Sequence, residues 1–218
     1  MKLIIMGPQA SGKGTQAKKI AKKYKLKHIS MGEIFREISR GKDELGKKVK
    51  ELIDNGNMVP DETTNEIVKK NISKNKNFIL DGYPRNIEQV KFLNNTTDID
   101  NVIFINTSHE EIIKRITGRR KCPECGKDYN INVDYLKPGK NELCDKCKVK
   151  LEKREDDNPT AIRIRLATFE EKTMPVLDYY RNEGILIEVN GNFTIEEIFK
   201  EITEKIEKRK KEKKKKNV

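Results

Sequence analysis

A glycine-rich turn follows directly after the first apolar run of the chain. Residues 3–6 are all apolar, and residues 7–15 read GPQASGKGT. The spacing of Gly7, Gly12 and Lys13 is the first part of a phosphate-binding loop pattern, although the hydroxyl residue comes one place later than usual. In such a loop, backbone N–H groups converge on an anion, and the positive N-terminal end of the next helix adds to their attraction. The turn therefore predicts a strand, a phosphate-binding loop and a helix, with a nucleoside triphosphate as the ligand.

Apolar, β-branched runs alternate along the chain with amphipathic stretches. The runs predict strands at residues 2–6, 27–30, 78–81, 101–106 and 184–189. The amphipathic stretches predict helices at residues 15–24, 61–74, 86–93, 108–117, 159–182 and 194–208. This alternation predicts an α/β fold with a five-stranded, mainly parallel sheet that is flanked by helices on both faces.

Two stretches interrupt this alternation. Residues 31–59 are helical in pattern and contain no expected strand, while residues 121–151 are rich in Cys, Lys, Asn and Asp and resemble neither a helix nor a core strand. We therefore expect a helical insertion at residues 30–59 and a separate small lobe at residues 121–157. The expected core consists of residues 1–29, 60–120 and 158–207, and a lysine-rich tail follows at residues 208–218.

The 218 residues carry a formal net charge of +12, and their composition is 34% hydrophobic and 38% charged. The tail alone holds eight basic residues and one acidic residue, so the rest of the chain has only a small positive excess. Such an excess suits a protein that binds two polyanionic nucleotides, whereas we expect the tail to be the frayed, solvated end of the last helix. A weak contact of the tail with RNA or an acidic surface is a minor alternative, and nucleic acid is otherwise not expected as a partner.

No apolar run approaches the roughly 20 residues that span a bilayer, so a membrane is not expected as a partner. Residues 1–6 already belong to the first expected strand, and they do not resemble a signal peptide. We therefore expect a cytoplasmic protein, and we expect it to act as a monomer.

All four cysteines lie in the second insertion as two C-x2-C pairs, Cys122 with Cys125 and Cys144 with Cys147. The 18 residues between the pairs fit a tetrahedral site in which four thiolates bind Zn²⁺. Disulfides are disfavoured in a reducing cytoplasm, and a redox C-x2-C pair needs no matching second pair. Four thiolates leave no open position on the metal, so we expect a structural ion, either zinc or iron, and not a catalytic one.

Ligands of a parallel sheet bind past the carboxyl ends of its strands, where the phosphate-binding loop, residues 81–85 and the entrance to the second insertion are expected to lie. Six arginines belong to these segments or to the insertions and the helix beside them: Arg36, Arg85, Arg115, Arg119, Arg154 and Arg165. Guanidinium groups gathered in one crevice repel each other unless a polyanion lies among them, so the set predicts a clamp for a transferring phosphoryl group. Asp81 ends the third expected strand and is expected to hold the water shell of Mg²⁺, together with Asp156 and Asp157, which are also suited to capping the following helix. His28 and His109 are assigned no function.

Five of these patterns together are similar to those of one enzyme family. They are GPQASGKGTQ at residues 7–16, DGYPR at residues 81–85, R-x3-R-R at residues 115–120, the paired C-x2-C, and R-x-D-D followed by R-x-R. Through them the chain resembles the adenylate kinases, among the nucleoside monophosphate kinases, in the variety with a long zinc-bearing lid. The resemblance extends over about residues 2–199, which is nearly the whole chain.

This resemblance implies a P-loop nucleoside triphosphate hydrolase-like core, a helical insertion that binds the nucleoside monophosphate (NMP), and a zinc-bearing lid. It also implies the reversible transfer of the terminal phosphoryl group of MgATP to AMP, which gives two ADP. The attacking group is then a phosphate oxygen that is already ionised at neutral pH, so no protein base is needed. Catalysis consists of positioning and charge neutralisation, and closure of the lid excludes water.

The resemblance further implies roles for individual residues. Those matched to the ATP site are Ala10, Ser11, Gly12, Lys13, Gly14, Thr15, Arg115, Arg119, Asp128, Tyr129 and Phe193. Those matched to the AMP site are Met31, Arg36, Asn57, Met58, Val59, Gly82, Tyr83, Pro84, Arg85, Gln89, Arg154 and Arg165. The expected catalytic set is Lys13, Arg85, Arg119, Arg154 and Arg165.

Two positions depart from the family pattern. Met31 stands where the family usually has a threonine, and a thioether cannot donate a hydrogen bond to the base of the monophosphate. A kinase for UMP, CMP or GMP on the same fold is therefore one alternative function, and a zinc-ribbon protein that binds nucleic acid is a more remote one. Ala10 stands where glycine is common, and we expect a backbone conformation there that alanine tolerates.

Overall fold

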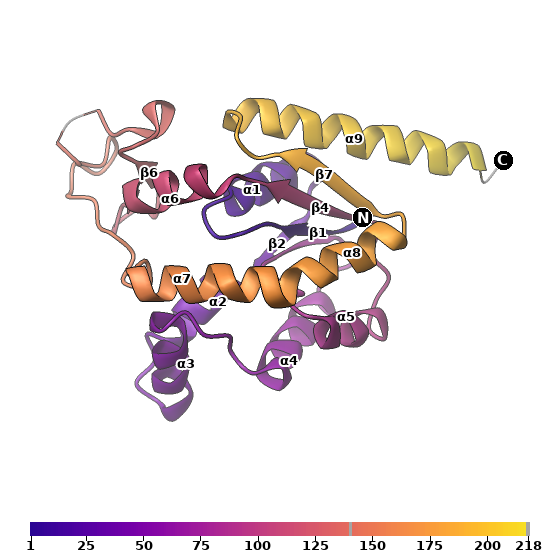
Figure 1. The fold of residues 1–218 in the computed structure, drawn as a ribbon, viewed down its shortest axis with the longest axis horizontal. Coiled ribbons are helices and arrows are strands. Elements are labelled where there is room, and N and C mark those ends of the chain that lie inside the picture. Colours follow the sequence, from indigo (N-terminus) through magenta and orange to yellow (C-terminus); the bar gives the residue numbers. More distant parts are fainter. Residues whose placement is uncertain (140, 217–218) are drawn as a thin grey trace.

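The computed structural model describes residues 1–139 and 141–216. Its centre is a five-stranded sheet with the strand order β2-β3-β1-β4-β7, and every neighbouring pair of strands is parallel. The strands are β1 (Lys2–Met6), β2 (Lys27–Ser30), β3 (Phe78–Asp81), β4 (Asn101–Asn106) and β7 (Leu186–Asn190). Helices lie on both faces of this sheet (Figure 1), so the predicted fold class is confirmed.

Two groups of helices cover the sheet. One face carries α1 (Lys13–Tyr24) and α9 (Ile195–Lys216), which contact each other. The opposite face carries α4 (Asp61–Ile72), α5 (Ile87–Asn94) and α8 (Met174–Asn182) (Figure 1). Between β2 and α4 the chain forms α2 (Met31–Ile38) and α3 (Glu44–Asp54), and α6 (His109–Gly118) leads from β4 to the cysteine-bearing lobe.

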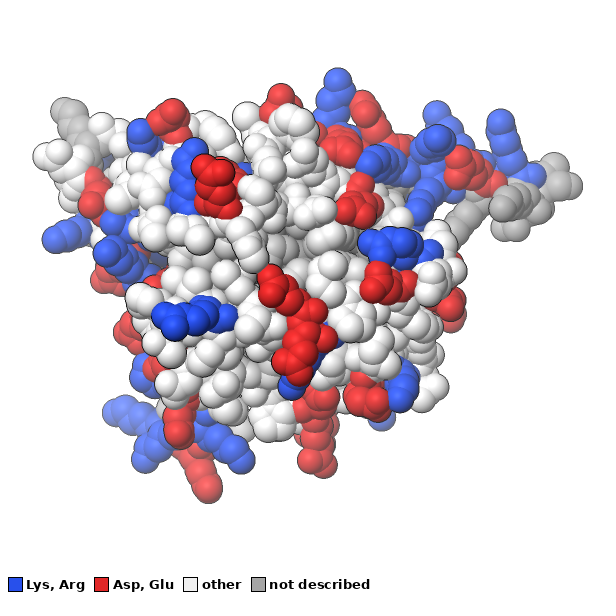
Figure 2. Space-filling view, in the orientation of Figure 1, with Lys and Arg blue, Asp and Glu red and all other residues white. Residues whose placement is uncertain are grey.

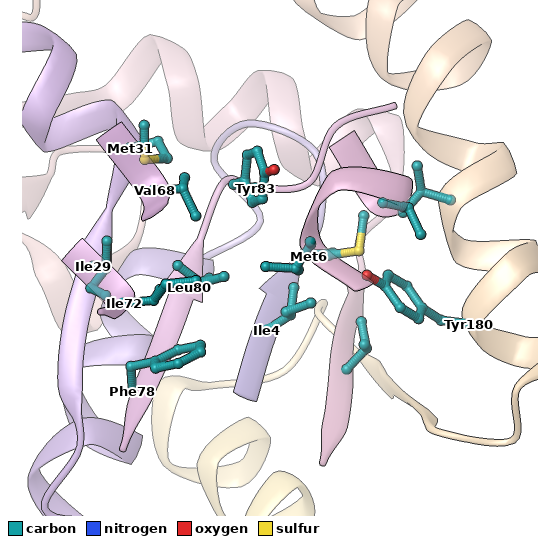
Figure 3. Close-up of a cluster of buried hydrophobic side chains, with 14 of the residues drawn as sticks. Ile4, Met6, Ile29, Met31, Val68, Ile72, Phe78, Leu80, Tyr83 and Tyr180 are labelled. Atoms are coloured by element: carbon teal, nitrogen blue, oxygen red, sulfur yellow. The ribbon is translucent and has the colours of Figure 1, made fainter. Parts of the chain in front are cut away.

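The alternation of side chains along each strand builds a core on both faces of the sheet. In β1, Leu3 and Ile5 pack beneath α1 and α9, whereas Ile4 and Met6 belong to the core on the opposite face. Figure 3 shows this second core, in which Ile4 and Met6 lie among side chains from the neighbouring strands and from α8. A strand that is buried on both faces reads as a continuous apolar run, which explains why the first strand was readable from sequence.

The structure departs from the sequence prediction at the C-terminal half of the core. β7 begins at Leu186 and not at residue 184, because Gly184 has a φ of 69° and belongs to the turn after α8. The single helix predicted at residues 159–182 consists of α7 (Pro159–Thr168) and α8, joined by a π-helical turn, η2 (Phe169–Thr173). The chain therefore stays helical over this stretch but changes its winding beside the sheet.

Helix α9 continues to Lys216, so the prediction of a frayed tail is wrong for the part of residues 208–218 that the structure describes, and residues 217 and 218 lie outside that part. Arg209 donates hydrogen bonds to the Leu186 carbonyl at 2.6 Å and to Asn101 Oδ1 at 3.1 Å, and the Lys210 ammonium lies 4.4 Å from the ring centre of Tyr24. Basic side chains gather over this end of α9 (Figure 2). Neither α9 nor any other helix of the described residues is long and apolar enough to cross a membrane.

The second insertion has its own secondary structure. β5 (Arg119–Lys121) pairs antiparallel with β6 (Asp128–Asn130), and a short turn of 3₁₀ helix, η1 (Asp134–Leu136), follows. The interior of this lobe is small and consists of Cys122, Tyr129, Cys144 and Leu151. A core of this size is too small to stabilise the lobe by apolar burial alone.

Candidate active site

A large cavity opens beyond the carboxyl ends of β1, β2 and β3. Its volume is about 550 Å³, and the last residues of these strands, Met6, Ser30 and Asp81, line it. The phosphate-binding loop, α2, β6 and α7 contribute the other walls. Ligands of open parallel sheets bind at this end of the strands, and the volume is ample for a small organic ligand.

The phosphate-binding loop requires glycine at two places for two different reasons. A Cβ atom on Gly7 would lie 2.6 Å from Ser11 Oγ and 2.9 Å from the Ile105 carbonyl oxygen, so a side chain there has no room. Gly12 has a φ of 91° at the start of α1, a conformation that other residues rarely adopt. Ser11 Oγ is buried without a hydrogen-bond partner among the described residues, which suits a loop that binds an anion.

Ala10 lies in the same loop with a φ of 60°. The position therefore does require the left-handed conformation, and the prediction of an ordinary conformation at Ala10 is wrong. This conformation costs a residue with a Cβ atom about 1–2 kcal/mol. Backbone strain of this kind persists at ligand-binding sites because the surrounding structure enforces it.

Lys13 is the cation at the centre of the loop. Its Nζ donates a hydrogen bond to the Pro8 carbonyl at 3.0 Å. Burial, followed by the repulsion of neighbouring arginines such as Arg85 and Arg119, lowers the pKa of Lys13 to about 8, although Asp81 opposes the shift. The cavity therefore holds a lysine that gains much from a nearby anion.

Asp81 is a nearly buried carboxylate at the end of β3. Burial by itself raises its pKa, but the hydrogen bond from His28 and the charge of Lys13 outweigh burial and hold the pKa of Asp81 below its ordinary value. The carboxylate is also close to the loop, since a Cβ atom on Gly14 would lie 3.4 Å from Asp81 Oδ2. An ionised carboxylate beside a phosphate-binding loop is a suitable partner for Mg²⁺ or for its water shell.

His28 contacts this carboxylate, and the sequence analysis missed it. His28 Nε2 lies 3.3 Å from Asp81 Oδ2, and Ser30 Oγ lies 3.3 Å from the same oxygen. The pairing of β2 with β3 places Ser30 opposite Asp81, and His28 lies two residues before Ser30 on the same side of the strand. Knowing that β2 lies beside β3 would have placed His28 near Asp81, but motif spacing alone does not show which strands are neighbours.

Two neighbouring aspartates at the start of α7 pair with arginines across the cavity. Asp156 Oδ2 lies 3.0 Å from Arg165 Nη2 and 3.8 Å from Arg36 Nη1. Asp157 Oδ2 lies 3.2 Å from Arg119 Nη1. The capping position of α7 belongs to Asn158, whose side chain accepts a hydrogen bond from the Ala161 N–H. The two aspartates therefore hold guanidinium groups, and neither caps this helix.

Arg85 and Arg154 are held less completely. Arg85 Nε donates to the Gly82 carbonyl at 2.9 Å, and Arg154 Nη2 lies 3.6 Å from Asp128 Oδ1. Arg154 Nε is buried without a hydrogen-bond partner among the described residues. Burial, followed by the charge of Arg154, lowers the pKa of Arg119 to about 10. Nine basic and four acidic side chains line the cavity, so it favours anionic ligands.

The cavity gathers nearly all of the residues that the sequence assigned to the two nucleotides and to Mg²⁺; three do not line it. Asp157 pairs with Arg119, which does line the cavity. Gln89 lines a small adjoining pocket together with Phe35 and Met58. Met31 is fully buried and packs in the core near Val68 (Figure 3), so its thioether does not border the cavity.

The four cysteines converge within the lobe. Their sulfur atoms all lie within 4.8 Å of one another, and Cys125 Sγ lies 3.7 Å from Cys144 Sγ. A tetrahedral zinc site with Zn–S bonds of about 2.3 Å requires sulfur atoms about 3.8 Å apart. Cys122 Sγ and Cys144 Sγ each accept a backbone N–H three residues further on, at 3.4 Å. The donor set and its spacing therefore fit a four-thiolate metal site.

Tyr129 supports this site from β6. Its hydroxyl lies 3.4 Å from Cys144 Sγ and lowers the pKa of the Cys144 thiol to about 6. The same hydroxyl accepts the Asp145 N–H at 2.9 Å. A thiolate is the form of cysteine that binds a metal, so Tyr129 favours the binding state.

Comparison with known proteins gives a consistent result. A family model described as adenylate kinase matches residues 5–185. A protein named adenylate kinase from Thermotoga neapolitana is 44% identical over 209 residues, which cover 92% of this chain and 94% of that protein. Proteins of the same name from Petrotoga mobilis (43% identical, 93% of this chain and 95% of that protein) and Kosmotoga olearia (44% identical, 95% and 99%) match equally broadly.

Proposed function

Because the chain belongs to the adenylate kinase family, we propose that it transfers the terminal phosphoryl group of MgATP to AMP, reversibly, and forms two ADP. The observation that carries this proposal is a single cavity that is lined both by a phosphate-binding loop and by six arginines. One anionic ligand needs only the loop. The second set of cations, far along the chain from the first, supports a second phosphate-bearing ligand in the same cavity.

In this proposal the triphosphate binds along the loop at residues 10–15 and Lys13. Arg115 supports the loop, because its guanidinium donates to the Ser11 carbonyl at 3.3 Å and to the Gly191 carbonyl at 2.8 Å. The adenine of ATP then lies near Phe193, which is half-exposed and lines the cavity. Asp128 and Tyr129 of the lobe line the same end.

AMP binds in the other half, with its phosphate at Arg36 and Arg85 and its base toward Gln89. Arg85 suits this role because its guanidinium is held in place by the Gly82 carbonyl while burial, followed by the charge of Arg165, lowers its pKa. A partly buried guanidinium with few anionic neighbours favours an incoming phosphate. The backbone of residues 57–59 forms the adjacent wall.

The transferred phosphoryl group passes between these halves, among Lys13, Arg119, Arg154 and Arg165. These side chains neutralise the charge that develops on the phosphoryl oxygens, and they hold the attacking and departing oxygens in line. Mg²⁺, held through Asp81, would supply further positive charge beside the phosphates. Asp156 and Asp157 orient the arginines, and we therefore place them outside the first contacts of the metal.

The lobe at residues 121–157 acts as a lid in this proposal, and residues 30–59 act as the NMP-binding insertion. Arg119 and Arg154 stand at the two ends of the lobe, so its closure brings both guanidinium groups to the phosphates and excludes water. The metal in the lid is structural, and zinc is the ion that four thiolates favour. Thiols that remain free to bind metal support a reducing, cytoplasmic location. A monomeric state and the absence of nucleic-acid partners stay predictions.

Met31 was the reason to consider another monophosphate. The Met31 side chain packs in the core and does not line the cavity, so the presence of methionine in place of threonine does not change the cavity walls. This placement supports AMP over UMP, CMP or GMP. A nucleic-acid-binding role would leave the loop, Asp81 and the six arginines without a purpose.

The substitution Arg85→Ala tests the assignment of the two halves. We expect kcat/KM for AMP to fall by about 10²–10³-fold, because a charged donor to the phosphate is lost, while the dissociation constant of ATP changes little. Steady-state kinetics with AMP varied, together with ATP binding measured by calorimetry, separate these effects. Arg163→Ala, at an exposed position on α7 outside the cavity, is the matched control and should behave like the unmodified protein. An equal loss of ATP affinity in Arg85→Ala would contradict the assignment.

A further inference from the structure

The side-chain amide of Gln89 is held between two partners of fixed polarity. Its Oε1 accepts a hydrogen bond from the backbone N–H of Arg85 at 2.7 Å, and its Nε2 donates to Asp61 Oδ1 at 2.6 Å. Gln89 is only 1% exposed. A backbone N–H only donates and a carboxylate only accepts, so one of the two orientations of the amide satisfies both partners and the flipped orientation satisfies neither.

Asp61 is itself fixed in place. It is the first residue of α4, and Asn86 Nδ2 donates to its Oδ1 at 3.1 Å and to its Oδ2 at 2.9 Å. Asn86 is the N-cap residue of α5, where its Oδ1 accepts the N–H of Gln89 at 2.8 Å. The starts of two helices are therefore tied together around one carboxylate, and the position of the Gln89 amide follows from them.

The hydrogen bonds of Gln89 with Arg85 and Asp61 form a clamp that leaves one edge of the side-chain amide free. A primary amide offers two lone pairs on oxygen and two N–H groups, and Arg85 and Asp61 use one of each. When the two partners use the outer lone pair and the outer N–H, the remaining lone pair and N–H lie side by side on one edge of the amide. Gln89 lines the small pocket that adjoins the main cavity, with Phe35, Met58 and Val59 as its neighbours.

An acceptor beside a donor matches the 6-amino edge of adenine. The amino group of adenine donates, and the ring nitrogen next to it accepts, which is why glutamine recognises adenine through two hydrogen bonds. In guanine and hypoxanthine a carbonyl oxygen replaces the amino group, so the fixed Gln89 oxygen would face another acceptor. A freely flipping amide would lose this discrimination.

We propose that Asp61 is a specificity-determining positioning residue, which makes the monophosphate site prefer a 6-aminopurine over a 6-oxopurine by holding the Gln89 amide in one orientation. The inference rests on the proposed function, because it takes Gln89 to lie at the base of the bound monophosphate. Asp61 lines neither the main cavity nor the small pocket beside it, so its effect on the bound base passes through Gln89.

The substitution Asp61→Asn tests this inference with little change in shape. An asparagine amide donates as well as accepts, so it can pair with either orientation of Gln89, and only the Arg85 N–H still favours the original one. We expect the ratio of kcat/KM for AMP to kcat/KM for IMP, measured at saturating MgATP, to fall by about tenfold or more. Most of the change should be a loss of efficiency with AMP, with IMP unchanged or improved. Glu62→Gln, an equal change of charge at the exposed neighbouring position, should leave the ratio unaltered.

A purely structural role for Asp61 predicts a different result, in which both substrates lose efficiency by the same factor and the ratio stays constant. That result would overturn the inference and leave the proposed function intact. A wild-type protein that forms no ADP from AMP would overturn both. If Asp61→Asn does not fold, side-chain amide NMR of the wild type decides the matter, because the clamp requires slow exchange of the Gln89 NH₂ protons in the free protein. Fast exchange of both protons would refute it.

Discussion

At the scale of single residues, the cavity strongly alters the pKa of Lys13. Burial lowers its pKa to about 8, so part of the population is neutral in the slightly alkaline range. Phosphates bound beside the amine favour the ammonium form. Binding of ATP above pH 8 must therefore be accompanied by uptake of a proton at Lys13.

This linkage gives a prediction for the affinity of the protein for ATP. Between pH 8 and about pH 9.5 the dissociation constant should rise by as much as tenfold per pH unit, because the charged form of Lys13 becomes rarer in the free protein. Below pH 8 the affinity should change little from this cause. Titration calorimetry at a series of pH values measures the effect. Lys13→Arg keeps its charge over this range and should remove the dependence, whereas a wild-type affinity that is constant up to pH 9.5 would contradict the argument.

Most of the residues that the sequence analysis assigned to the nucleotides line one cavity, and their roles stay predictions. Spacing alone placed Lys13 and the arginines at strand ends, because a parallel sheet brings its carboxyl ends to one edge. The contacts of His28 with Asp81 and of Asp61 with Gln89 were missed. Each joins segments that are distant in sequence, and only the strand register or the packing of α4 against α5 brings them together.

At the scale of elements, the cysteine-bearing lobe is the part of the molecule whose stability depends on something other than a core. Its few buried side chains include two of the cysteines themselves. In small domains, binding of a structural zinc ion contributes an apparent free energy of roughly 10–16 kcal/mol to folding at neutral pH. The metal is therefore expected to hold the lobe together, while the sheet and its helices are independent of it.

Removal of the metal by a strong chelator should unfold the lobe first. Hydrogen–deuterium exchange should rise sharply over residues 119–152 and remain slow in β1, β3 and β4, whose residues are buried in two large clusters. Cys144→Ser should reproduce this pattern without chelator, and elemental analysis should show one metal ion lost per chain. A uniform loss of protection across the sheet would contradict the view that the lobe folds around its metal separately.

Elements whose signal is local were predicted well, and those shaped by packing were not. β1, β3 and β4 are short, mainly apolar runs, and the bounds of all four strands from β1 to β4 agree with those predicted from the sequence. The π-helical turn at Phe169–Thr173 has no sequence signature of that kind. Its side chains make contacts with segments that are distant in sequence. Phe169 stacks on Phe104 with ring centres 6.4 Å apart, and Thr173 donates a hydrogen bond to the Arg85 carbonyl at 2.9 Å.

At the scale of the whole molecule, the two insertions meet the core around one cavity. Arg165 of α7 donates to the Ile53 carbonyl at 2.7 Å, and Asn158 donates to the Asp54 carbonyl at 2.8 Å. Lys50 of α3 lies 3.0 Å from Glu155 at the end of the lobe. The first insertion therefore contacts both α7 and the end of the second insertion, and basic side chains from both insertions and from the phosphate-binding loop line the same cavity.

The account stands on the claim that this space orients a triphosphate so that a bound AMP receives its terminal phosphoryl group. The most direct test is ADP formation by the purified protein with MgATP and, in turn, AMP, UMP, CMP, GMP or no monophosphate. We predict two ADP for each ATP consumed with AMP, rates at least tenfold lower with the other monophosphates, and a loss of about 10³-fold in Lys13→Ala. ATP consumption that does not depend on AMP, or a Lys13→Ala variant with nearly normal kcat, would contradict it.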